Sequence, residues 1–375
     1  MNPKHVVLAI AVFVGVAVNN SIGESLVYFG TYTGAKSQGI YVSRFDPATG
    51  RLSAPELAAE TQNPSFLAVH LKGRYLYAVN EVDNTGIVSA FALDANTGKL
   101  TPLNRQASGG SGPCHLAVDA TGKCLLVANY NSGSIAALPI HSDGSLGEAT
   151  TTIQHAGSSV NLARQAGPHA HFISLSPDNR FALNCDLGLD KVFAYRLDAD
   201  AAKLSPSEPP FASVAPGSGP RHLTFSPDGK FVYVINEMAS TISTFTYNAT
   251  NAALAEMQTL STLPKDFSGN NTAAEIIMHP SGKFLYGSNR GDDSIAVFAV
   301  DQKSGLLTFI ECQSTQGRTP RHFVIDSTGH WLLAENQASD SVVVFAIDPD
   351  TGKLKPNGQT IAVGAPICAV FVEGK

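Results

Sequence analysis

Apolar residues alternate with polar ones along most of the chain, in short runs separated by turn residues. One phrase, residues 219–236, has the sequence GPRHLTFSPDGKFVYVIN, in which two alternating runs flank a Ser-Pro-Asp-Gly turn. Alternation with a period of two on both sides of a tight turn is the sequence form of a β-hairpin. We name the run before the turn strand A and the run after it strand B.

This hairpin phrase returns throughout the chain. Clear copies begin at Gly112 and Thr319, and weaker ones at Asn63, Gly167, Thr272 and Ala365. Successive starts lie about 46 to 55 residues apart, a spacing typical of repeat architectures. After B comes a third alternating run, such as residues 294–300, then an Asp-x-x-(Ser/Thr)-Gly-x-Leu turn and a fourth run. Four antiparallel strands in each repeat predict the blade of a β-propeller.

The two ends of the chain complete one blade between them. Residues 25–60 supply strands B, C and D without an A, whereas residues 366–372 supply an A with nothing after it. With the six internal repeats, the sequence predicts an all-β, seven-bladed β-propeller, closed by the N-terminal strands pairing with the C-terminal strand. The alternative, a β-sandwich with extra domains, would show no common register between the copies.

Bulk properties narrow the choice of partner. The 375 residues are 43% hydrophobic and 15% charged, which suits a folded protein with many short elements. The net charge is −6 and Lys and Arg do not cluster, so we expect neither a nucleic acid nor an acidic membrane surface as partner. Five cysteines without Cys-x-x-Cys spacing give no zinc cluster, and we expect no metal or cofactor. The expected partner is a small molecule, bound by a monomer.

The first residues differ from the rest. Lys4 and His5 precede an apolar run over residues 6–18, and a possible cleavage site lies near Gly23. We predict a signal peptide over residues 1–23 and a single propeller domain over residues 24–375, exported to the periplasm or outside the cell. Thirteen apolar residues are too few for a membrane span, which needs about 20, although an uncleaved anchor is the alternative. Without a signal peptide the protein would be cytoplasmic.

Aligning the repeats on their turn glycine sorts residues into rings around the expected channel. Because A and B are antiparallel, the start of A and the end of B share one rim. The ring at the end of B is mostly asparagine, which fits side-chain amides that bond the following loop. The next ring is mixed, as expected for a binding site on a symmetric frame, and two further rings lie at the start of A. The members are Tyr32, Glu81, Tyr130, Leu187, Glu237, Arg290 and Gln337, then Ser65, Cys114, His171, Arg221, Ala274 and Arg321, then Phe66, His115, Phe172, His222, Glu275 and His322.

Unlike polar residues gather in one sector of this rim. Arg221 and Glu237 belong to one hairpin, Arg290 occupies the place of Glu237 in the next blade, and His171 occupies the place of Arg221 in the preceding blade. We predict these four residues to be catalytic. Those predicted to bind substrate around them are Glu81, His115, Tyr130, His169, His222, Asn236, Asn289, Arg321 and His322.

These residue types suit a reaction at a carboxyl derivative. A histidine or glutamate can move protons near neutral pH, and arginines can hold an anion or a developing oxyanion. Because no Gly-x-Ser-x-Gly elbow, His-Glu-x-x-His helix or Walker loop is evident, water activated by His171 or Glu237 is the expected nucleophile.

Other interpretations of the same residues stay open. Arg221 and Glu237 could form a simple salt bridge, and the histidines of the inner ring could bond neighbouring blades. His169 and His171 form a His-x-His pair that could hold a metal, but no third ligand is evident.

Four phrases closely resemble one known family, the seven-bladed lactonases, which include the bacterial propeller-type 6-phosphogluconolactonases and the fungal carboxymuconate-lactonizing enzymes. They are YFGTYT, GPHAH, GPRHLTFSPDG and GSNRG, at residues 28–33, 167–171, 219–229 and 287–291, and the resemblance extends over residues 25–373. It implies a metal-independent site of one histidine, two arginines and a glutamate, which fall on His171 (or His169), Arg221, Arg290 and Glu237.

The resemblance implies hydrolysis of a sugar lactone, 6-phospho-D-glucono-1,5-lactone to 6-phosphogluconate in the pentose phosphate pathway. An exported protein would meet a different lactone, one without a phosphate, because phosphogluconolactone is a cytoplasmic intermediate. Two alternatives stay beside hydrolysis: cyclisation of the muconate-lactonizing type at the same site, and an exported propeller that binds a ligand without catalysis.

Overall fold

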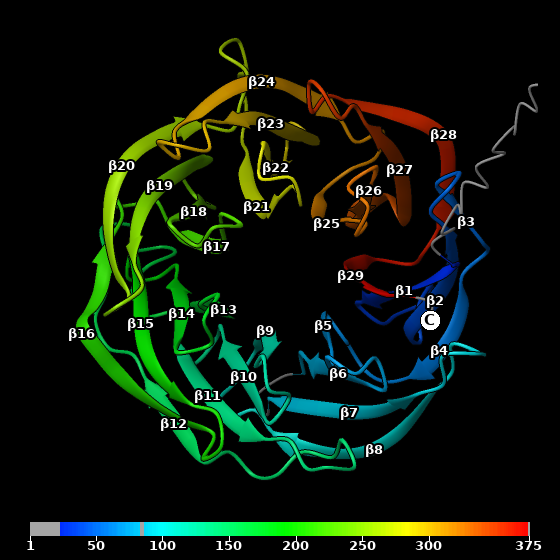
Figure 1. Ribbon diagram of the computed structural model, residues 1–375, viewed down its shortest axis with the longest axis horizontal. Coiled ribbons are helices and arrows are strands. Elements are labelled where there is room, and N and C mark those ends of the chain that lie inside the picture. The colour runs from blue at the N-terminus through cyan, green and yellow to red at the C-terminus, as the bar shows by residue number, and fades with distance from the viewer. Residues whose placement is uncertain (1–22, 83–85, 374–375) are drawn as a thin grey trace, which may run out of the picture.

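Seven twisted sheets form a ring around a central channel in the computed structural model, which describes residues 23–82 and 86–373 (Figure 1). The seven-bladed β-propeller expected from the repeats is therefore confirmed. Residues 1–22, which hold nearly all of the predicted signal peptide, lie outside the described residues. None of the helical segments among the described residues is long and apolar enough to cross a membrane.

Every blade has the same order of strands from the channel outward. The innermost strands are β5 (Phe66–Val69), β9 (Pro113–Val118), β13 (Ala170–Leu175), β17 (Pro220–Phe225), β21 (Thr272–Met278), β25 (Pro320–Ile325) and β29 (Pro366–Val372). The second strands are β1 (Ser25–Thr31), β6 (Tyr75–Asn80), β10 (Cys124–Asn129), β14 (Phe181–Asp186), β18 (Phe231–Asn236), β22 (Phe284–Arg290) and β26 (Trp331–Asn336).

The third and fourth strands form the outside of the ring. The third strands are β2 (Gly39–Asp46), β7 (Ile87–Leu93), β11 (Ser134–Pro139), β15 (Lys191–Asp198), β19 (Thr241–Asn248), β23 (Ser294–Val300) and β27 (Ser341–Ile347). The outermost strands are β3 (Arg51–Leu52) with β4 (Glu56–Glu60), then β8 (Leu100–Ala107), β12 (Thr151–Gln154), β16 (Lys203–Ser213), β20 (Ala253–Ser261), β24 (Leu307–Ser314) and β28 (Leu354–Ala362). A short 3-10 turn, η1 (Gln337–Ser339), follows β26.

The blade shared by the two ends closes the ring as the sequence predicted. Strand β29 pairs antiparallel with β1, with Tyr28 opposite Val370. The outer edge of this blade is divided, because β3 and β4 both pair with β2. The first and last described strands thus share one continuous hydrogen-bond ladder, and the sheet that they complete leaves no gap in the ring.

The Ser-Pro-Asp-Gly phrase forms the tight turn between the two inner strands. Between β17 and β18, the Ser226 hydroxyl donates to Asp228 Oδ1 over 2.7 Å and accepts the Phe231 amide over 3.0 Å. Gly229 has φ +69°, a left-handed conformation that favours glycine. The turn sets the register that places Leu223 opposite Val234, and therefore brings the start of β17 and the end of β18 to the same rim.

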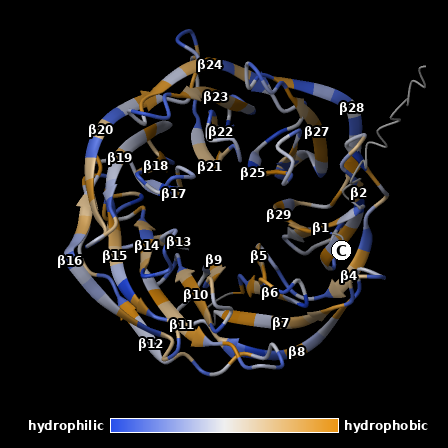
Figure 2. Ribbon diagram, in the orientation of Figure 1, coloured by the Kyte–Doolittle hydropathy of each residue, from blue (hydrophilic) through white to orange (hydrophobic). Residues whose placement is uncertain are grey.

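The hydrophobic core lies between neighbouring blades, and Figure 2 shows apolar residues concentrated on the inner strands. The sheets of the fifth and sixth blades pack through fully buried side chains such as Tyr233, Ile235, Leu285 and Phe298. Burying one large apolar side chain contributes about 1.5–3 kcal/mol, so each interface between blades is a substantial source of stability.

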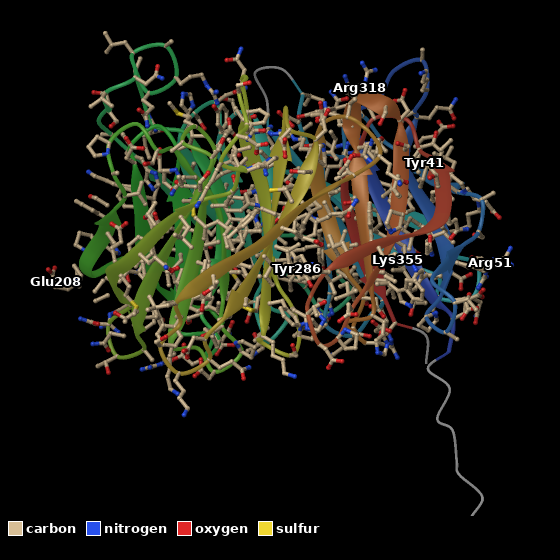
Figure 3. The ribbon with its side chains drawn as sticks, turned by 90° about the horizontal axis from the view of Figure 1, so that it is seen from above. Tyr41, Arg51, Glu208, Tyr286, Arg318 and Lys355 are labelled. Carbon is tan, nitrogen blue, oxygen red and sulfur yellow. The ribbon has the colours of Figure 1, made fainter. Side chains whose placement is uncertain are left out.

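Buried tyrosines also join neighbouring blades by hydrogen bonds. In four second strands a tyrosine hydroxyl donates to the carbonyl of the glycine in the turn between the third and fourth strands of the next blade. The pairs are Tyr28 with Gly98, Tyr77 with Gly144, Tyr233 with Gly305, and Tyr286 with Gly352, over 3.0, 3.1, 3.0 and 2.8 Å. These bonds lie at the rim of the inner turns. Figure 3 shows the ring edge-on, with Tyr286 among the strands and Arg318 at the opposite, upper face.

Candidate active site at one rim of the channel

A cavity of about 350 Å³ opens where the second strands end. Five of its lining residues belong to the mixed ring that follows the asparagines, namely Tyr32, Glu81, Tyr130, Glu237 and Arg290. The inner strands contribute Cys114, His171 and Arg321, and the connecting loops contribute Asn131 and Arg164. The ring in which residue type changes from blade to blade therefore forms much of the cavity wall.

A smaller void of about 10 Å³ lies deeper in the channel, beneath this cavity. The residues that line both spaces are Glu81, Cys114, His171 and Arg321. The remaining lining residues of the void are Ser65, Phe66, Arg221, His222, Glu275, His322 and Ile367. The first ring at the start of the inner strands thus contributes to both spaces, whereas members of the second ring line only the small void.

The carboxylate of Glu237 is the centre of the site, because three arginines bind it. Arg164 Nη2 donates to Oε1 over 2.7 Å, whereas Oε2 lies 2.9 Å from Arg290 Nη2 and 3.2 Å from Arg221 Nε. The residue is only 5% exposed. Burial alone would raise the pKa of Glu237, but the charges of Arg290, Arg221 and Arg164 outweigh it and lower the pKa to about 2. Glu237 is therefore ionised at neutral pH.

The deeper arginines are held in place by the blades. Arg221 Nη1 donates to the carbonyl of Ala274 over 2.8 Å, and Arg290 Nη2 donates to that of Ala273 over 3.1 Å. The Arg321 guanidinium lies 5.8 Å from the ring centroid of Tyr32, a cation–π contact. Cations fixed in this way can stabilise negative charge without rearranging when that charge develops.

His171 is a buried, neutral imidazole between the two spaces. Its ring packs edge-on against Tyr130 and His222, with centroids 5.5 and 5.2 Å away, and its Nδ1 is buried without a hydrogen-bond partner. Burial lowers the pKa of His171 well below its usual range, and the charge of Arg221 adds to the effect. The ring is therefore neutral at neutral pH, with a lone pair that can take up a proton in a reaction, and it is a weaker base than a free imidazole.

The structure brings three of the four predicted catalytic residues, His171, Glu237 and Arg290, to the wall of the cavity. Arg221 lines the small void instead and contacts the site through Glu237. Of the predicted substrate-binding residues, Glu81, Tyr130 and Arg321 line the cavity itself.

Four of the predicted binding residues line neither the cavity nor the small void. Asn236 Nδ2 donates to Thr241 and Ser243 within its own blade, and Asn289 Nδ2 donates to the Thr262 carbonyl. The Asn236 amide thus bonds the neighbouring strand β19, and that of Asn289 bonds the segment before its blade, which are structural roles within the blades. The other two, His169 and His115, make the aromatic contacts described next.

His169 and His115 pack against aromatic rings. The ring of His169 stacks on Tyr130 with centroids 4.4 Å apart, and its Nδ1 lies 3.0 Å from the Tyr130 carbonyl. His115 lies in the deepest layer, between Phe66 and Phe172, with centroids 4.1 and 4.2 Å away. Among residues 23–82 and 86–373, no group of three or more His, Cys, Asp and Glu residues is arranged to hold a metal.

His222 and His322 join carboxylates across blades beneath the cavity. Glu275 Oε2 lies 3.0 Å from His222 Nδ1 and 3.5 Å from His322 Nε2, and His322 Nδ1 lies 2.9 Å from Glu335 Oε2. Burial raises the pKa of both Glu275 and Glu335. These histidines bond neighbouring blades, the alternative to substrate binding, while their rings also line the small void.

Sequence reasoning missed Arg164, Tyr32 and Cys114 as site residues. Tyr32 and Cys114 stand in the mixed rings, so the alignment of repeats already contained them. Arg164 lies outside the hairpins, on the loop between β12 and β13. The sequence feature that indicated an extra loop here is the interval from Gly112 to Gly167, the longest between successive repeat starts.

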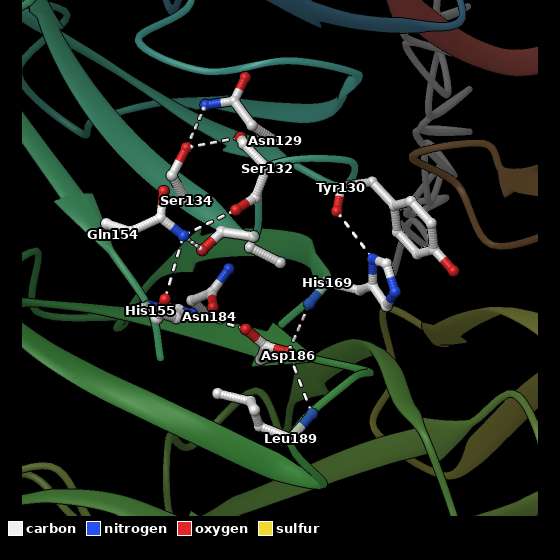
Figure 4. A network of polar contacts seen from close by, with 12 residues as sticks. Asn129, Tyr130, Ser132, Ser134, Gln154, His155, His169, Asn184, Asp186 and Leu189 are labelled. Atoms are coloured by element: carbon white, nitrogen blue, oxygen red, sulfur yellow. Dashed lines mark hydrogen bonds and ion pairs between the residues drawn. The ribbon is translucent and has the colours of Figure 1, made fainter. Parts of the chain in front are cut away.

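The loop that carries Arg164, residues 155–169, is clamped by one carboxylate, as Figure 4 shows. Asp186 Oδ2 lies 2.6 Å from His155 Nδ1 at the start of the loop, and Oδ1 accepts the His169 amide over 2.8 Å at its end. Asp186 occupies the position that is asparagine in other blades. A carboxylate suits this place because both of its oxygens accept, whereas an asparagine amide group would present a donor to one of the two partners.

Comparison with known proteins connects this geometry to one group of enzymes. The family described as "Lactonase, 7-bladed beta-propeller" matches residues 26–371. The 6-phosphogluconolactonase of Bacillus subtilis is 39% identical over 345 residues, 92% of this chain and 97% of that protein. The 6-phosphogluconolactonase of Formosa agariphila is 33% identical over 344 residues, 90% of this chain and 96% of that protein.

A solved structure has the same fold. The periplasmic gluconolactonase of Pseudomonas aeruginosa superposes with a TM-score of 0.88 at 36% sequence identity, over 93% of this chain and 99% of that chain.

Proposed function

The chain belongs to the seven-bladed β-propeller lactonase family, and we propose on that basis that it hydrolyses a sugar lactone, 6-phospho-D-glucono-1,5-lactone, to 6-phosphogluconate in the pentose phosphate pathway. The observation that carries the proposal is the ionised carboxylate of Glu237, surrounded by arginines and close to the neutral His171 at one cavity. This combination suits attack by water at a carbonyl carbon that becomes an oxyanion.

The size and charge of the cavity support a small anionic substrate. Its volume of about 350 Å³ lies within the range of small-molecule sites. Arg164, Arg290 and Arg321 face two glutamates, Glu81 and Glu237, among the described lining residues, so one positive charge is left for an anion. Two relatives that match almost the whole chain are named 6-phosphogluconolactonase, which agrees with a phosphorylated sugar acid lactone.

The proposed reaction uses water as nucleophile. His171 accepts a proton as the water oxygen bonds to the lactone carbonyl carbon, and the carbonyl oxygen becomes an oxyanion near Arg290 and Arg321. The oxyanion then collapses, the bond between the carbonyl carbon and the ring oxygen breaks, and the proton on His171 passes to the departing ring oxygen. Glu237 holds Arg221 and Arg290 in position throughout. The product is the open-chain acid.

A second substrate, glucono-1,5-lactone without a phosphate, has its own support. The Pseudomonas neighbour is named a periplasmic gluconolactonase, and the predicted signal peptide would export this chain to the same kind of compartment. In that case the pentose phosphate assignment fails while lactone hydrolysis at the same site stands.

The test is a lactone assay on the purified protein. Phosphogluconolactone and gluconolactone are incubated separately with the protein, and acid release is followed with a pH indicator after subtraction of the spontaneous rate. We expect catalysed opening of the phosphorylated lactone. Rates equal to spontaneous hydrolysis for both lactones would refute the proposal, and loss of a conjugated diene from a muconate would indicate cyclisation instead.

A further inference from the structure

Arg164 differs from the two other arginines beside Glu237 in where it comes from and how exposed it is. Arg221 and Arg290 belong to blade strands, and their side chains are 3% and 12% exposed. The Arg164 side chain extends from the loop 155–169 and is 40% exposed. One guanidinium at the mouth of the cavity is therefore accessible to solvent, while the deeper ones are enclosed.

The hydrogen-bond partners of the Arg164 guanidinium are side chains rather than backbone groups. Its Nη2 donates to Glu237 Oε1 over 2.7 Å and to the Tyr130 hydroxyl over 3.4 Å. Arg221 and Arg290 each donate to a backbone carbonyl as well as facing Glu237. Rotation about the side-chain bonds of Arg164 therefore breaks hydrogen bonds to these two side chains and none to the backbone of a blade.

The backbone that carries Arg164 is fixed. Asp186 clamps both ends of the loop, and inside the loop the Ser159 hydroxyl donates to Asp190 over 2.5 Å while Gln165 Nε2 donates to the Leu187 carbonyl over 2.9 Å. Gln165 itself is fully buried. The loop backbone is thus held by hydrogen bonds beside the cavity, which leaves the Arg164 side chain as the part that can move.

Glu237 does not depend on Arg164 for a counter-ion. Its Oε2 keeps Arg290 and Arg221 at 2.9 and 3.2 Å, whereas Arg164 binds only Oε1. If an anion takes Arg164 away, Glu237 still has two cations beside it and one oxygen that turns towards the cavity. A phosphate is a suitable competitor, because guanidinium groups bind phosphate and carboxylate with the same bidentate geometry.

We propose that Arg164 is the specificity-determining residue that binds an anionic substituent of the substrate, exchanging Glu237 Oε1 for a phosphate oxygen. The loop 155–169 then sets the preference for a phosphorylated over an unphosphorylated lactone, while the residues of the blades carry the ring opening. This inference rests on the proposed function and assigns the substrate charge to one side chain.

The experiment compares wild type, Arg164→Gln and Arg164→Lys on phosphogluconolactone and gluconolactone. For Arg164→Gln we expect KM for the phosphorylated lactone to rise about 10- to 100-fold, the range for one lost charge-assisted hydrogen bond, with kcat little changed. The kcat/KM for gluconolactone, which has no phosphate for Arg164 to bind, should fall much less than that for the phosphorylated lactone. Lysine should restore part of the preference, because it keeps the charge without the fork.

Arg318→Gln is the matched control. Arg318 is exposed on the same rim, donates to the Ala338 carbonyl and does not line the cavity, so its loss removes the same charge without altering the site. Both lactones should be opened as by wild type. An equal loss on both lactones in Arg164→Gln, or a wild-type protein without preference for the phosphorylated lactone, would overturn the inference.

Calorimetry with 6-phosphogluconate and gluconate separates this inference from the proposed function, because binding requires no turnover. If wild type opens neither lactone, the proposed hydrolysis fails, and calorimetry then decides the role of Arg164. Weaker binding of 6-phosphogluconate by Arg164→Gln, with Arg318→Gln unchanged, supports the role. If Arg164→Gln binds 6-phosphogluconate as tightly as Arg318→Gln does, or if wild type does not bind it, the proposed role of Arg164 is overturned.

Discussion

The two rims of the ring differ in how closely the blades resemble one another there. At the rim of the inner turns, the same contacts recur: Ser226 donates to Asp228 over 2.7 Å, and Ser176 donates to Asp178 over 2.6 Å in the preceding blade. At the cavity rim, equivalent positions hold tyrosine, glutamate, leucine and arginine. Because a fold needs the same turn in each blade while a ligand meets each blade once, repetition indicates scaffold and variation indicates a binding site.

An exception to repetition carries the same information. The asparagine ring next to the cavity is nearly uniform, and the amide of Asn289, for example, donates to the Thr262 carbonyl in the segment before its own blade. Asp186 interrupts it, and this carboxylate clamps the loop that brings Arg164 to the cavity. Asp186 is thus one of two departures from this ring, the other being Thr31 in the first blade, and it lies in the blade whose preceding loop carries a site residue.

The comparison of rims is tested most strongly by removing one carboxylate from each. Both Glu237 and Asp228 have a pKa lowered to about 2, the first by buried arginines that outweigh burial, the second by Lys230 and Ser226. Glu237→Gln should lower kcat/KM for the lactone about 100- to 1,000-fold, because the arginines lose their positioning partner.

Asp228→Asn is the control and should leave kcat/KM unchanged, since the residue lies at the other rim. Circular dichroism and thermal unfolding check that both variants fold, because Glu237→Gln leaves buried arginines without their counter-ion and lowers stability. Similar losses of activity in the two variants would contradict the division of labour between the rims.

A smaller effect concerns pH. The proposed base, His171, works unprotonated, and its pKa is lowered by burial and by Arg221, so kcat/KM should stay constant as the pH falls to 6.5 and decline only well below it. His171→Gln should lower the rate and abolish this acid limb. A limb centred at or above pH 6.5, or an identical limb in the variant, would assign the proton transfer to another group.

The smallest expected effect is at the rim of the inner turns. Tyr233→Phe deletes the hydroxyl that donates to Gly305 of the next blade over 3.0 Å and leaves a buried carbonyl without its donor. We expect unfolding free energy to fall by about 1 kcal/mol, measured by urea denaturation, with unchanged kcat/KM. Tyr32→Phe removes a hydroxyl that donates to Glu81 over 2.7 Å at the cavity, and should alter KM more than stability. A change of KM in Tyr233→Phe together with a loss of stability in Tyr32→Phe would contradict the difference between the two rims.

The fold was predictable because the hairpin phrase recurs along the chain. Each copy of the hairpin phrase repeats the same turn and alternation, so errors at single positions average out, and the strand predicted over residues 294–300 is β23 itself. The closure of the ring followed from the missing strand at one end and the extra strand at the other. Repetition also located the rim of the cavity, since the mixed ring supplies five of its lining residues.

The parts of the site that could not be predicted depend on depth and on loops. Ring position places a residue at a rim but does not say whether its side chain turns into the channel, as that of Glu237 does, or into the blade, as that of Asn236 does. Arg221 shares a ring with His171 but lines only the small void, and His115 packs between two aromatic rings. Arg164 had no equivalent in other blades, so no alignment of repeats could assign it a place.

The pairing of β1 with β29 has a consequence for biosynthesis. A ribosome makes β1 before all the other described strands and β29 after them, so the blade to which both belong is the last of the seven to be finished. Until then the inner edge of β1 lacks its neighbour and is open to mispairing with another nascent chain. Protection of that edge by a chaperone would matter most for this blade, and least for the six whose strands follow one another directly.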